Sequence, residues 1–144
     1  MSVALLDVSV LFALIYERHP RHSDVHAWFA QSGTAGWATC AQTQMSVMRL
    51  LGSSFAEDLN LTMATAAALV RTLCEHRDHH YWPQDIVPSG NEAFHWALAR
   101  GRNQLPDLYL LALAVRQGGV LATLDRRIAV HAVKGAGAEH LVVL

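Results

Sequence analysis

The sequence predicts an α/β protein with helices on both faces of a short, mainly parallel sheet of four or five strands. Two observations carry this prediction. Short apolar runs, typical of buried strands, alternate along the chain with longer runs that suit helices. Strands that alternate with helices are joined by right-handed crossovers, which place helices on both sides of a parallel sheet. We therefore expect a three-layer α/β/α sandwich, and the 144 residues suit a single domain over residues 1–144.

The N-terminal part of the chain is expected to begin with a strand and two helices. Residues 3–6 are apolar and few, as in a buried strand, and a helix is expected at 10–16. A polar loop then leads into a second helix, for which Ser23 or Asp24 is the expected N-cap and Gly33 the terminator.

The middle of the chain contains the clearest helix of the sequence. A second strand is expected at 35–38, followed by a helix at 39–51 that Gly52 ends. The next helix is capped by Thr62 and is rich in Ala and Leu, the residues with the best helix propensity.

The remaining elements are marked by proline, asparagine and glycine. Residues 81–82 suit a third strand that ends at Pro83, and Asn91 is the expected cap of a helix that runs to about Arg100. Pro106 begins a further helix that ends at paired glycines, the usual asymmetry of helix termini. The last expected strands, the second of them only possible, are residues 120–124 and 141–144.

The composition limits the class of protein. A hydrophobic fraction of 52% and a mean hydropathy of +0.19 exclude a disordered chain. No apolar run reaches the roughly 20 residues that a membrane-spanning helix needs, and no basic leader precedes the first apolar run. Cys40 and Cys74 lack the spacing of a metal site, so we expect reduced thiols in a cytoplasmic protein. With a formal charge of −1, any contact with nucleic acid must come from local basic patches.

Asp7 is an isolated carboxylate in the apolar stretch VALLDVSVLFAL. Burying an ionised acid without partners is very costly, so hydrogen bonds, a cation or a metal must compensate it. Asp7 ends the first expected strand, Asp125 closely follows the fourth, and Asp107 lies in the first turn of the helix that leads into the fourth strand. Ligands of open parallel sheets bind at this edge, near a topological switch point. Three acids that meet there indicate a site for a hard cation such as Mg²⁺ or Mn²⁺.

Structural roles are the alternative for two of these acids. Asp107 could complement the dipole of its helix, and Asp125 could cap the loop that carries Arg126 and Arg127. Asp7 fits a purely structural role less well, because its neighbours on both sides are apolar.

Four sequence blocks resemble, in their order and spacing, those of PIN-domain ribonucleases, specifically the VapC-type toxins of bacterial toxin–antitoxin pairs. The blocks are LLDVSVLFAL, WATCAQTQMSVMRLL, LPDLYLLALA and GGVLATLD, and the resemblance covers residues 3–127. The segment HHYWPQDIVP is similar to the one that follows the central helices in a VapC subgroup. The resemblance implies a PIN-like fold and an endoribonuclease that depends on Mg²⁺ or Mn²⁺.

The same resemblance implies which residues act. The acidic set of the family corresponds here to Asp7, Gln44, Asp107 and Asp125. Of these, the three aspartates are the expected metal ligands, and Gln44 stands where the family most often has glutamate, so weaker metal binding is expected. Thr123 matches a hydroxyl that supports the site, and Ser9 is a less certain supporting residue.

The implied substrate is RNA, such as tRNA or rRNA, recognised through single-stranded or looped shape. Phosphate contacts give affinity without sequence information, and a solvated surface position is the alternative for each basic candidate. The candidates are Arg49, Arg100, Arg102, Arg126 and Arg127. The resemblance also implies a cognate VapB-type antitoxin that blocks the active site, and a homodimer.

Other interpretations of the sequence stay open. A PIN-like module without catalysis would bind RNA or protein, with metal binding impaired by Gln44. A haloacid-dehalogenase-like phosphatase would use Asp7 as nucleophile, but its pattern needs a second aspartate where this chain has Ser9. A zinc site is not expected, because the histidines lack the HExxH pattern and a cysteine pair. They are expected in loops or in solvent, and include His22, His26, His76, His79 and His80. The expected core or interface tryptophans are Trp28, Trp37, Trp82 and Trp96.

Overall fold

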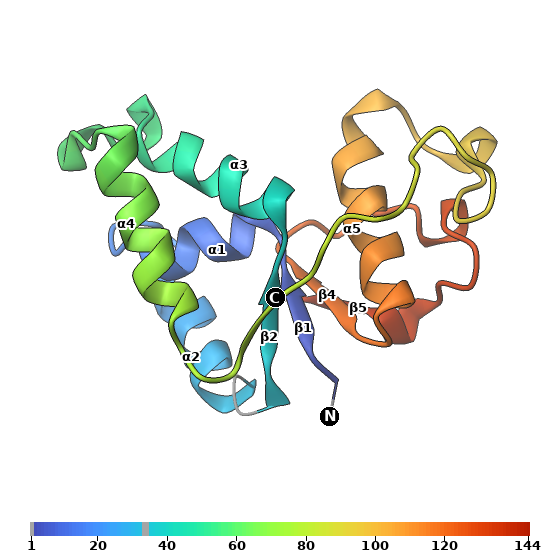
Figure 1. Ribbon diagram of the computed structural model, residues 1–144, viewed down its shortest axis with the longest axis horizontal. Coiled ribbons are helices and arrows are strands. Elements are labelled where there is room, and N and C mark those ends of the chain that lie inside the picture. Colours follow the sequence, from blue (N-terminus) through green and yellow to red (C-terminus); the bar gives the residue numbers. More distant parts are fainter. Residues whose placement is uncertain (1, 33–34) are drawn as a thin grey trace.

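The structure is a computed structural model that describes residues 2–32 and 35–144 (Figure 1). At its centre is a five-stranded sheet in the order β3-β2-β1-β4-β5, in which every neighbouring pair is parallel. The prediction of a short parallel sheet is confirmed, and the possible fifth strand is present. The strands are β1 (Ala4–Leu6), β2 (Trp37–Thr39), β3 (His79–Tyr81), β4 (Val120–Thr123) and β5 (Leu141–Val143).

Helices cover both faces of the sheet, which confirms the three-layer prediction. Helices α1 to α4 form one layer, and α5 with the segments around it forms the other (Figure 1). The helices are α1 (Val8–Ile15), α2 (His22–Ser32), α3 (Ala41–Leu51), α4 (Met63–Cys74) and α5 (Leu105–Arg116).

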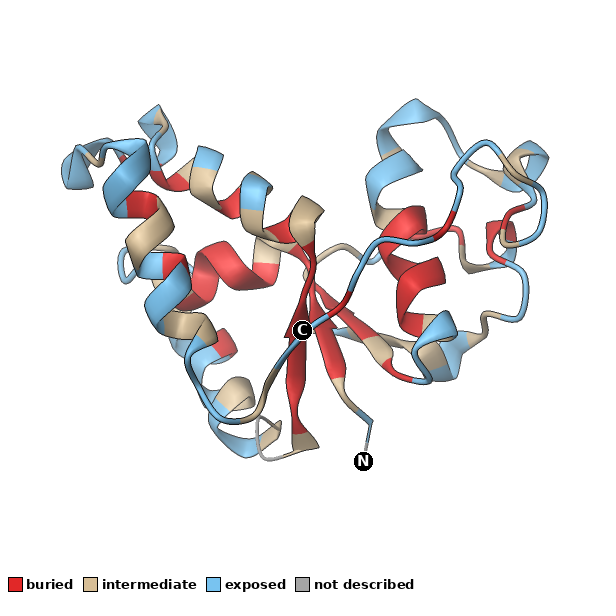
Figure 2. Ribbon diagram, in the orientation of Figure 1, coloured by how far each residue is buried: buried red, intermediate tan, exposed pale blue. Residues whose placement is uncertain are grey.

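Each layer has its own core of buried apolar side chains. Successive strand residues point to opposite faces, so Leu5 and Leu121 join the cluster under α5, while Leu6 and Ala122 join the cluster under α1 to α4. Figure 2 shows the central strands β1, β2 and β4 and the inward helix faces as the buried part of the chain. On α5, all residues from 108 to 114 are buried, as its nearly continuous apolar sequence requires.

Helix capping agrees with the sequence at two helices. Thr62 is the N-cap of α4, and its hydroxyl accepts the backbone N–H of Thr65 at 3.1 Å. Pro106 lies in the first turn of α5, where its missing N–H costs no helical hydrogen bond.

The first two helices begin earlier than expected. Asp7 is itself the N-cap of α1, so the helix starts at Val8 instead of residue 10. Helix α2 starts at His22, which places the expected caps Ser23 and Asp24 inside its first turn. The expected terminator, Gly33, lies outside the described residues.

The third strand lies nearer the N-terminus than expected, at His79–Tyr81. It is an edge strand that pairs only with β2 among the described residues, and two of its three side chains are exposed. Polar residues are common on such edges. Because the strand begins with two histidines, it lacks the apolar pattern by which a buried strand is recognised in the sequence. His80 is exposed to solvent, as expected, but both His79 and His80 belong to this strand and not to a loop.

The expected helix from Asn91 to about Arg100 is absent, and residues 96–98 form only a short 3₁₀ turn. Phe94 instead forms an antiparallel bridge with Val133, and the His95 N–H donates to the Ala132 carbonyl at 2.8 Å. Pairing with a distant part of the chain thus replaces local helical hydrogen bonds, because weak helix propensity yields readily to tertiary contacts.

The sheet order places a topological switch point between β1 and β4, where the chain turns from one half of the sheet to the other. Open α/β sheets bind ligands outside the carboxyl ends of the strands at such a point. Asp7 follows β1 directly, and Asp125 follows β4 after one residue. In residues 2–32 and 35–144, no helix is both long enough and apolar enough to cross a membrane.

Candidate active site

Asp7 is buried at the switch point, and three neighbours hold its carboxylate. Its Oδ1 accepts the Val8 backbone N–H at 2.6 Å, and its Oδ2 accepts the hydroxyls of Ser9 at 3.1 Å and Thr123 at 2.7 Å. The sequence predicts that something must compensate the burial of the Asp7 carboxylate. These hydrogen bonds supply part of that compensation, because each one offsets some of the free-energy cost of burying the charge.

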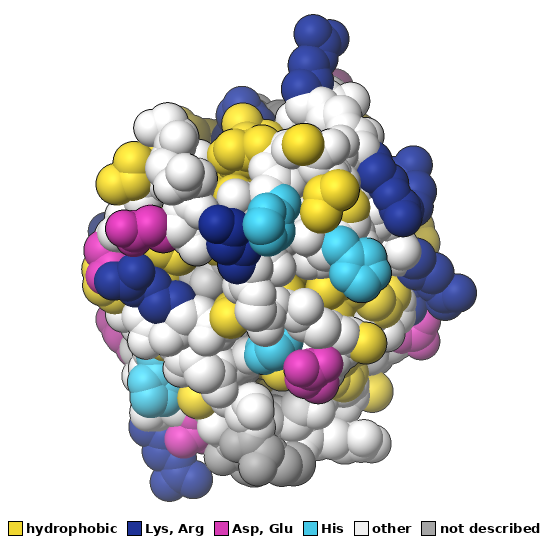
Figure 3. Space-filling model, turned by 90° about the vertical axis from the view of Figure 1, so that its right-hand side faces the viewer, with side chains coloured by type: hydrophobic (Ala, Val, Ile, Leu, Met, Phe, Trp, Pro, Cys, Tyr) yellow, Lys and Arg dark blue, Asp and Glu magenta, His cyan; other side chains and the backbone are white. Residues whose placement is uncertain are grey.

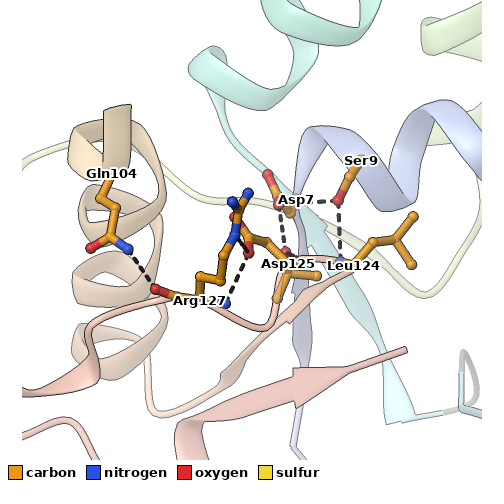
Figure 4. Close-up of polar contacts among 7 residues, drawn as sticks. Asp7, Ser9, Gln104, Leu124, Asp125 and Arg127 are labelled. Carbon is orange, nitrogen blue, oxygen red and sulfur yellow. Dashed lines mark hydrogen bonds and ion pairs between the residues drawn. The ribbon is translucent and has the colours of Figure 1, made fainter. Parts of the chain in front are cut away.

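Ser9 and Thr123 also tie the two central strands together at this end (Figure 4). The Thr123 hydroxyl oxygen accepts the Asp125 N–H at 3.0 Å, and the Ser9 oxygen accepts the Leu124 N–H at 3.3 Å. Both hydroxyls therefore contact Asp7 and the chain after β4, which are the contacts expected of supporting residues.

Asp125 is more exposed and is held by Arg127. Its Oδ1 accepts the Arg127 backbone N–H at 2.9 Å and the Arg127 Nε at 3.2 Å. Gln104, just before α5, donates its side-chain amide to the Arg127 carbonyl, so the loop after β4 is tied to the start of α5 (Figure 4).

Asp107 and Asp7 line one cavity of about 330 Å³ between one face of α3 and the first turns of α5. Asp125 is not part of its wall, but all three carboxylates are close enough to affect one another electrostatically. The structure thus brings the three predicted acids together at one edge of the sheet.

The three carboxylates have different electrostatic environments. Burial raises the pKa of Asp7, and hydrogen bonds from Thr123, Val8 and Ser9 partly oppose this effect. Burial, and then the charges of Asp7 and Asp125, raise the pKa of Asp107 to about 7. The backbone N–H and guanidinium of Arg127 lower the pKa of Asp125. Asp107 is therefore the acid whose ionised form is least compensated.

The donor chemistry of this cluster fits a hard divalent cation, since carboxylate oxygens are the ligands that Mg²⁺ and Mn²⁺ prefer. Within the described parts of the chain, no three acidic, histidine or cysteine side chains are placed to hold one ion together. Mg²⁺ usually keeps several waters and takes only one or two protein carboxylates. The pair that lines the cavity, Asp7 and Asp107, satisfies that requirement.

Gln44 is not part of this cluster, contrary to its expected place in the acidic set. Its side-chain amide donates to the Thr39 hydroxyl at 2.9 Å and approaches the Cys74 sulfur at 3.6 Å. It is also not among the residues that line the cavity with Asp7 and Asp107. Residue 44 lies on a different side of α3 from the cavity-lining residues, because successive residues turn by about 100°.

The cavity wall contains polar residues that the sequence did not single out. Gln42, Ser46 and the predicted Arg49 lie on one face of α3, and Asn103 comes from the segment before α5. The helical spacing could have identified Gln42 and Ser46. They lie seven and three residues before Arg49, so they share its face of the helix once Arg49 is assigned to the site.

The other predicted basic residues lie outside the cavity. Arg127 binds Asp125, while Arg100, Arg102 and Arg126 are exposed and do not line the cavity. On the face formed by α5 and its surroundings, Lys and Arg side chains are separated by hydrophobic and histidine side chains and form no continuous patch (Figure 3).

Comparison with known proteins identifies the family. Residues 4–134 match the PIN domain. The chain is 35% identical to Ribonuclease VapC44 of Mycobacterium tuberculosis, over 98% of its own length and 99% of that protein. The chain is a PIN-domain protein of the VapC ribonuclease family. It is also 33% identical to Ribonuclease VapC39 of the same organism, over 88% of this chain and 91% of that one.

A solved VapC structure shares the fold. VapC20 of Mycobacterium tuberculosis, described as a sarcin–ricin-loop-cleaving toxin, superimposes with a TM-score of 0.64 over 90% of this chain and 98% of that chain. Its sequence identity is only 13%, so this likeness concerns the fold alone.

Membership of the VapC family favours the endoribonuclease over the two alternatives. Relatives that span nearly the whole chain are named ribonucleases, which does not favour an inert binding module or a phosphatase. Cys40 and Cys74 are free thiols, as expected, and Trp37 and Trp82 are buried in the core. Trp28 and Trp96 are partly buried against the core.

Proposed function

We propose that this VapC-family protein is an endoribonuclease that depends on Mg²⁺ or Mn²⁺ and acts as the toxin of a toxin–antitoxin pair. The observation that supports it most is the meeting of Asp7, Asp107 and Asp125 at the switch point. There, burial and mutual repulsion raise the pKa of Asp107 to about 7. A divalent cation is the ligand that relieves this repulsion, and the names of the relatives supply the reaction class.

Asp7 and Asp107 would hold the metal, because both line the cavity. When bound, such an ion lowers the pKa of a water molecule and neutralises charge that develops on the scissile phosphate. Ser9 and Thr123 fix the orientation of Asp7 through its Oδ2. Asp125 has its Oδ1 engaged with Arg127, and its other oxygen would orient the attacking water.

Basic side chains would position the RNA backbone. Arg49 lines the cavity with the acids and forms no ion pair within residues 2–32 and 35–144, so it would contact the phosphate beside the cleavage site. Arg100, Arg102 and Arg126 are exposed and would contact phosphates further along the strand.

The proposed partners are a VapB-type antitoxin and a second copy of this chain, both in the cytoplasm. Such contacts would bury apolar side chains that are exposed on α3, on α4 and in the segment between them. They include Met45, Phe55 and Met63, which are 64%, 71% and 50% exposed. Light scattering of the purified protein, alone and with the product of a neighbouring small reading frame, tests both partners.

The central test is cleavage of structured RNAs by purified protein with Mg²⁺ or Mn²⁺, beside Asp7→Asn and Asp107→Asn. We expect cleavage by the wild type only, loss of cleavage with a chelator, and calorimetric Mn²⁺ binding that disappears in Asp107→Asn. Asp24→Asn, an exposed aspartate on α2, is the matched control. Equal cleavage by the wild type and both site variants would mean that a contaminating nuclease or a site elsewhere in the protein is responsible.

A further inference from the structure

A second cavity adjoins the acid-lined cavity between α3 and α5. The second cavity measures about 510 Å³ and shares Gln42, Ser46 and Pro106 with the wall of the first. The two cavities are therefore neighbours, as a phosphate and the base of an adjacent nucleotide would require.

The walls of the second cavity are apolar and well fixed. They are formed by Ile86, Pro88 and Leu105 together with the ring of Tyr109. The Tyr109 hydroxyl donates to the Ile86 carbonyl at 2.8 Å, and the Phe94 ring lies 6.2 Å from the Tyr109 ring, stacked behind it. Such preformed apolar walls suit a flat, uncharged group.

Two glutamine amides give the cavity a directional polar edge. The Gln84 side-chain oxygen accepts the backbone N–H of Gln42 at 2.5 Å, and the Gln42 side-chain amide donates to the Pro106 carbonyl at 3.3 Å. Each glutamine is thus oriented through one end. Across the described residues, the NH₂ of Gln84 and the side-chain oxygen of Gln42 have no other hydrogen-bond partner, so a donor and an acceptor remain for a ligand.

We propose that this second cavity binds the base of the nucleotide next to the scissile phosphate, and that Gln42 and Gln84 determine which base is preferred. The proposal rests on the proposed ribonuclease function and names a specificity site for it. A nucleobase is complementary to this cavity in two ways. Its flat faces fit against the apolar walls, and its edge carries both hydrogen-bond donors and acceptors that can pair with the two glutamine amides.

The first experiment measures binding without cleavage. The four ribonucleoside 5′-monophosphates are titrated into isotope-labelled full-length protein with Mg²⁺, and the side-chain amide signals of Gln42 and Gln84 are followed by NMR. We expect saturable shifts with one base bound best. Gln84→Ala should weaken that nucleotide about fivefold or more, the loss expected for a directed base contact. Gln117→Ala, an exposed glutamine at the other end of α5, is the matched control and should change nothing. If no nucleotide shifts either amide, the proposal is wrong.

The second experiment measures base preference in cleavage. Oligoribonucleotides that differ only in the nucleotide beside the cleavage site are compared by kcat/KM. Gln84→Ala should reduce the ratio between the best and worst base about fivefold or more, while cleavage of the worst substrate persists. An unchanged ratio overturns the proposal.

The two experiments separate the base site from the ribonuclease function. Nucleotide binding that depends on Gln84 in a protein that cuts no RNA would support the base site and contradict the proposed function. If Asp7→Asn abolishes cleavage but Gln84→Ala leaves the base preference unchanged, the proposed ribonuclease function would be supported and the base site contradicted. Saturation of the cavity by an antitoxin segment, with no response to any nucleotide, would overturn the base site.

Discussion

Helix α3 separates two polar clusters that differ in how their charges are compensated. On one side, Asp7 and Asp107 line a cavity and repel each other. On the other side, the Thr39 hydroxyl lies 2.8 Å from the His79 Nε2 and accepts the Gln44 amide at 2.9 Å, with the Cys74 sulfur beside them.

In the second cluster, the polar side chains form hydrogen bonds with one another, and all of them are neutral. Burial lowers the pKa of His79 and raises the pKa of Cys74, so neither side chain is charged at neutral pH. In the acid cluster, no cationic side chain forms an ion pair with Asp7 or Asp107 among the described residues, and their carboxyl groups repel each other. The comparison shows that buried polar residues near a sheet are structural when they compensate one another, and are functional candidates when they leave charge over.

Replacement of Asp107 by asparagine should have the largest effect, because it removes a carboxylate that would hold the metal. We expect kcat/KM for RNA cleavage to fall about 10³-fold, since a bound metal supplies several kcal/mol of transition-state stabilisation. The protein should remain folded by circular dichroism, and Asp24→Asn should cleave like the wild type. Retention of wild-type cleavage in the variant would place the active site elsewhere.

Gln44→Ala should affect stability and not catalysis. The free energy of unfolding should fall by about 1 kcal/mol, because partly buried hydrogen bonds to Thr39 and Cys74 are lost. Chemical denaturation measures this change, and kcat/KM should stay near the wild-type value.

Gln44→Glu is the sharper test of the boundary between the clusters. The new carboxylate would face Thr39 and Cys74, so Mn²⁺ affinity by calorimetry should not increase. A gain of about tenfold, or 1.4 kcal/mol, would assign residue 44 to the acid cluster after all.

The stability of the metal-free protein should decrease as pH rises. Asp107 has a pKa of about 7 when folded, compared with an ordinary value of 3.8. Between these values the folded state binds more protons than the unfolded state, so the free energy of unfolding falls with rising pH. For a half-buried carboxyl screened by solvent, we expect a loss of about 1–2 kcal/mol.

This decrease is measured by urea unfolding from about pH 4 to about pH 8, in the window that the pKa shift defines. Asp107→Asn should lose the part of the decrease that Asp107 contributes, leaving the part that comes from the raised pKa of Asp7, and added Mg²⁺ should reduce the decrease in the wild type. Parallel curves for the wild type and the variant would contradict the assignment of the raised pKa to Asp107.

Ser9→Ala should reduce catalysis much less than Asp107→Asn does. Its hydroxyl donates to Asp7 and accepts the Leu124 N–H, while Thr123 still holds the same carboxylate oxygen. We expect kcat/KM to fall about threefold to tenfold, equivalent to about 1 kcal/mol. Ser23→Ala on α2, an exposed serine, is the control, and equal activity of the two variants would show that Ser9 does not position Asp7.

Elements with strong local patterns were predictable from the sequence. Helix α4 begins after Thr62 and α5 carries Pro106 in its first turn, because capping chemistry and propensity act between near neighbours. The segment near Asn91 lacked such local control, and its pairing with residues around Val133 overrode the expected helix.

The sheet class and the convergence of Asp7, Asp107 and Asp125 follow from the order of strands and helices in the sequence, because parallel crossovers bring strand ends to one edge whatever the side-chain details. The face of α3 that meets those acids could not be predicted in this way. Over two turns, α3 places Gln42, Ser46 and Arg49 in the cavity and directs Gln44 to Thr39 and Cys74. The rotation of a helix about its own axis is fixed by packing against distant residues, and those contacts exist only in the folded chain.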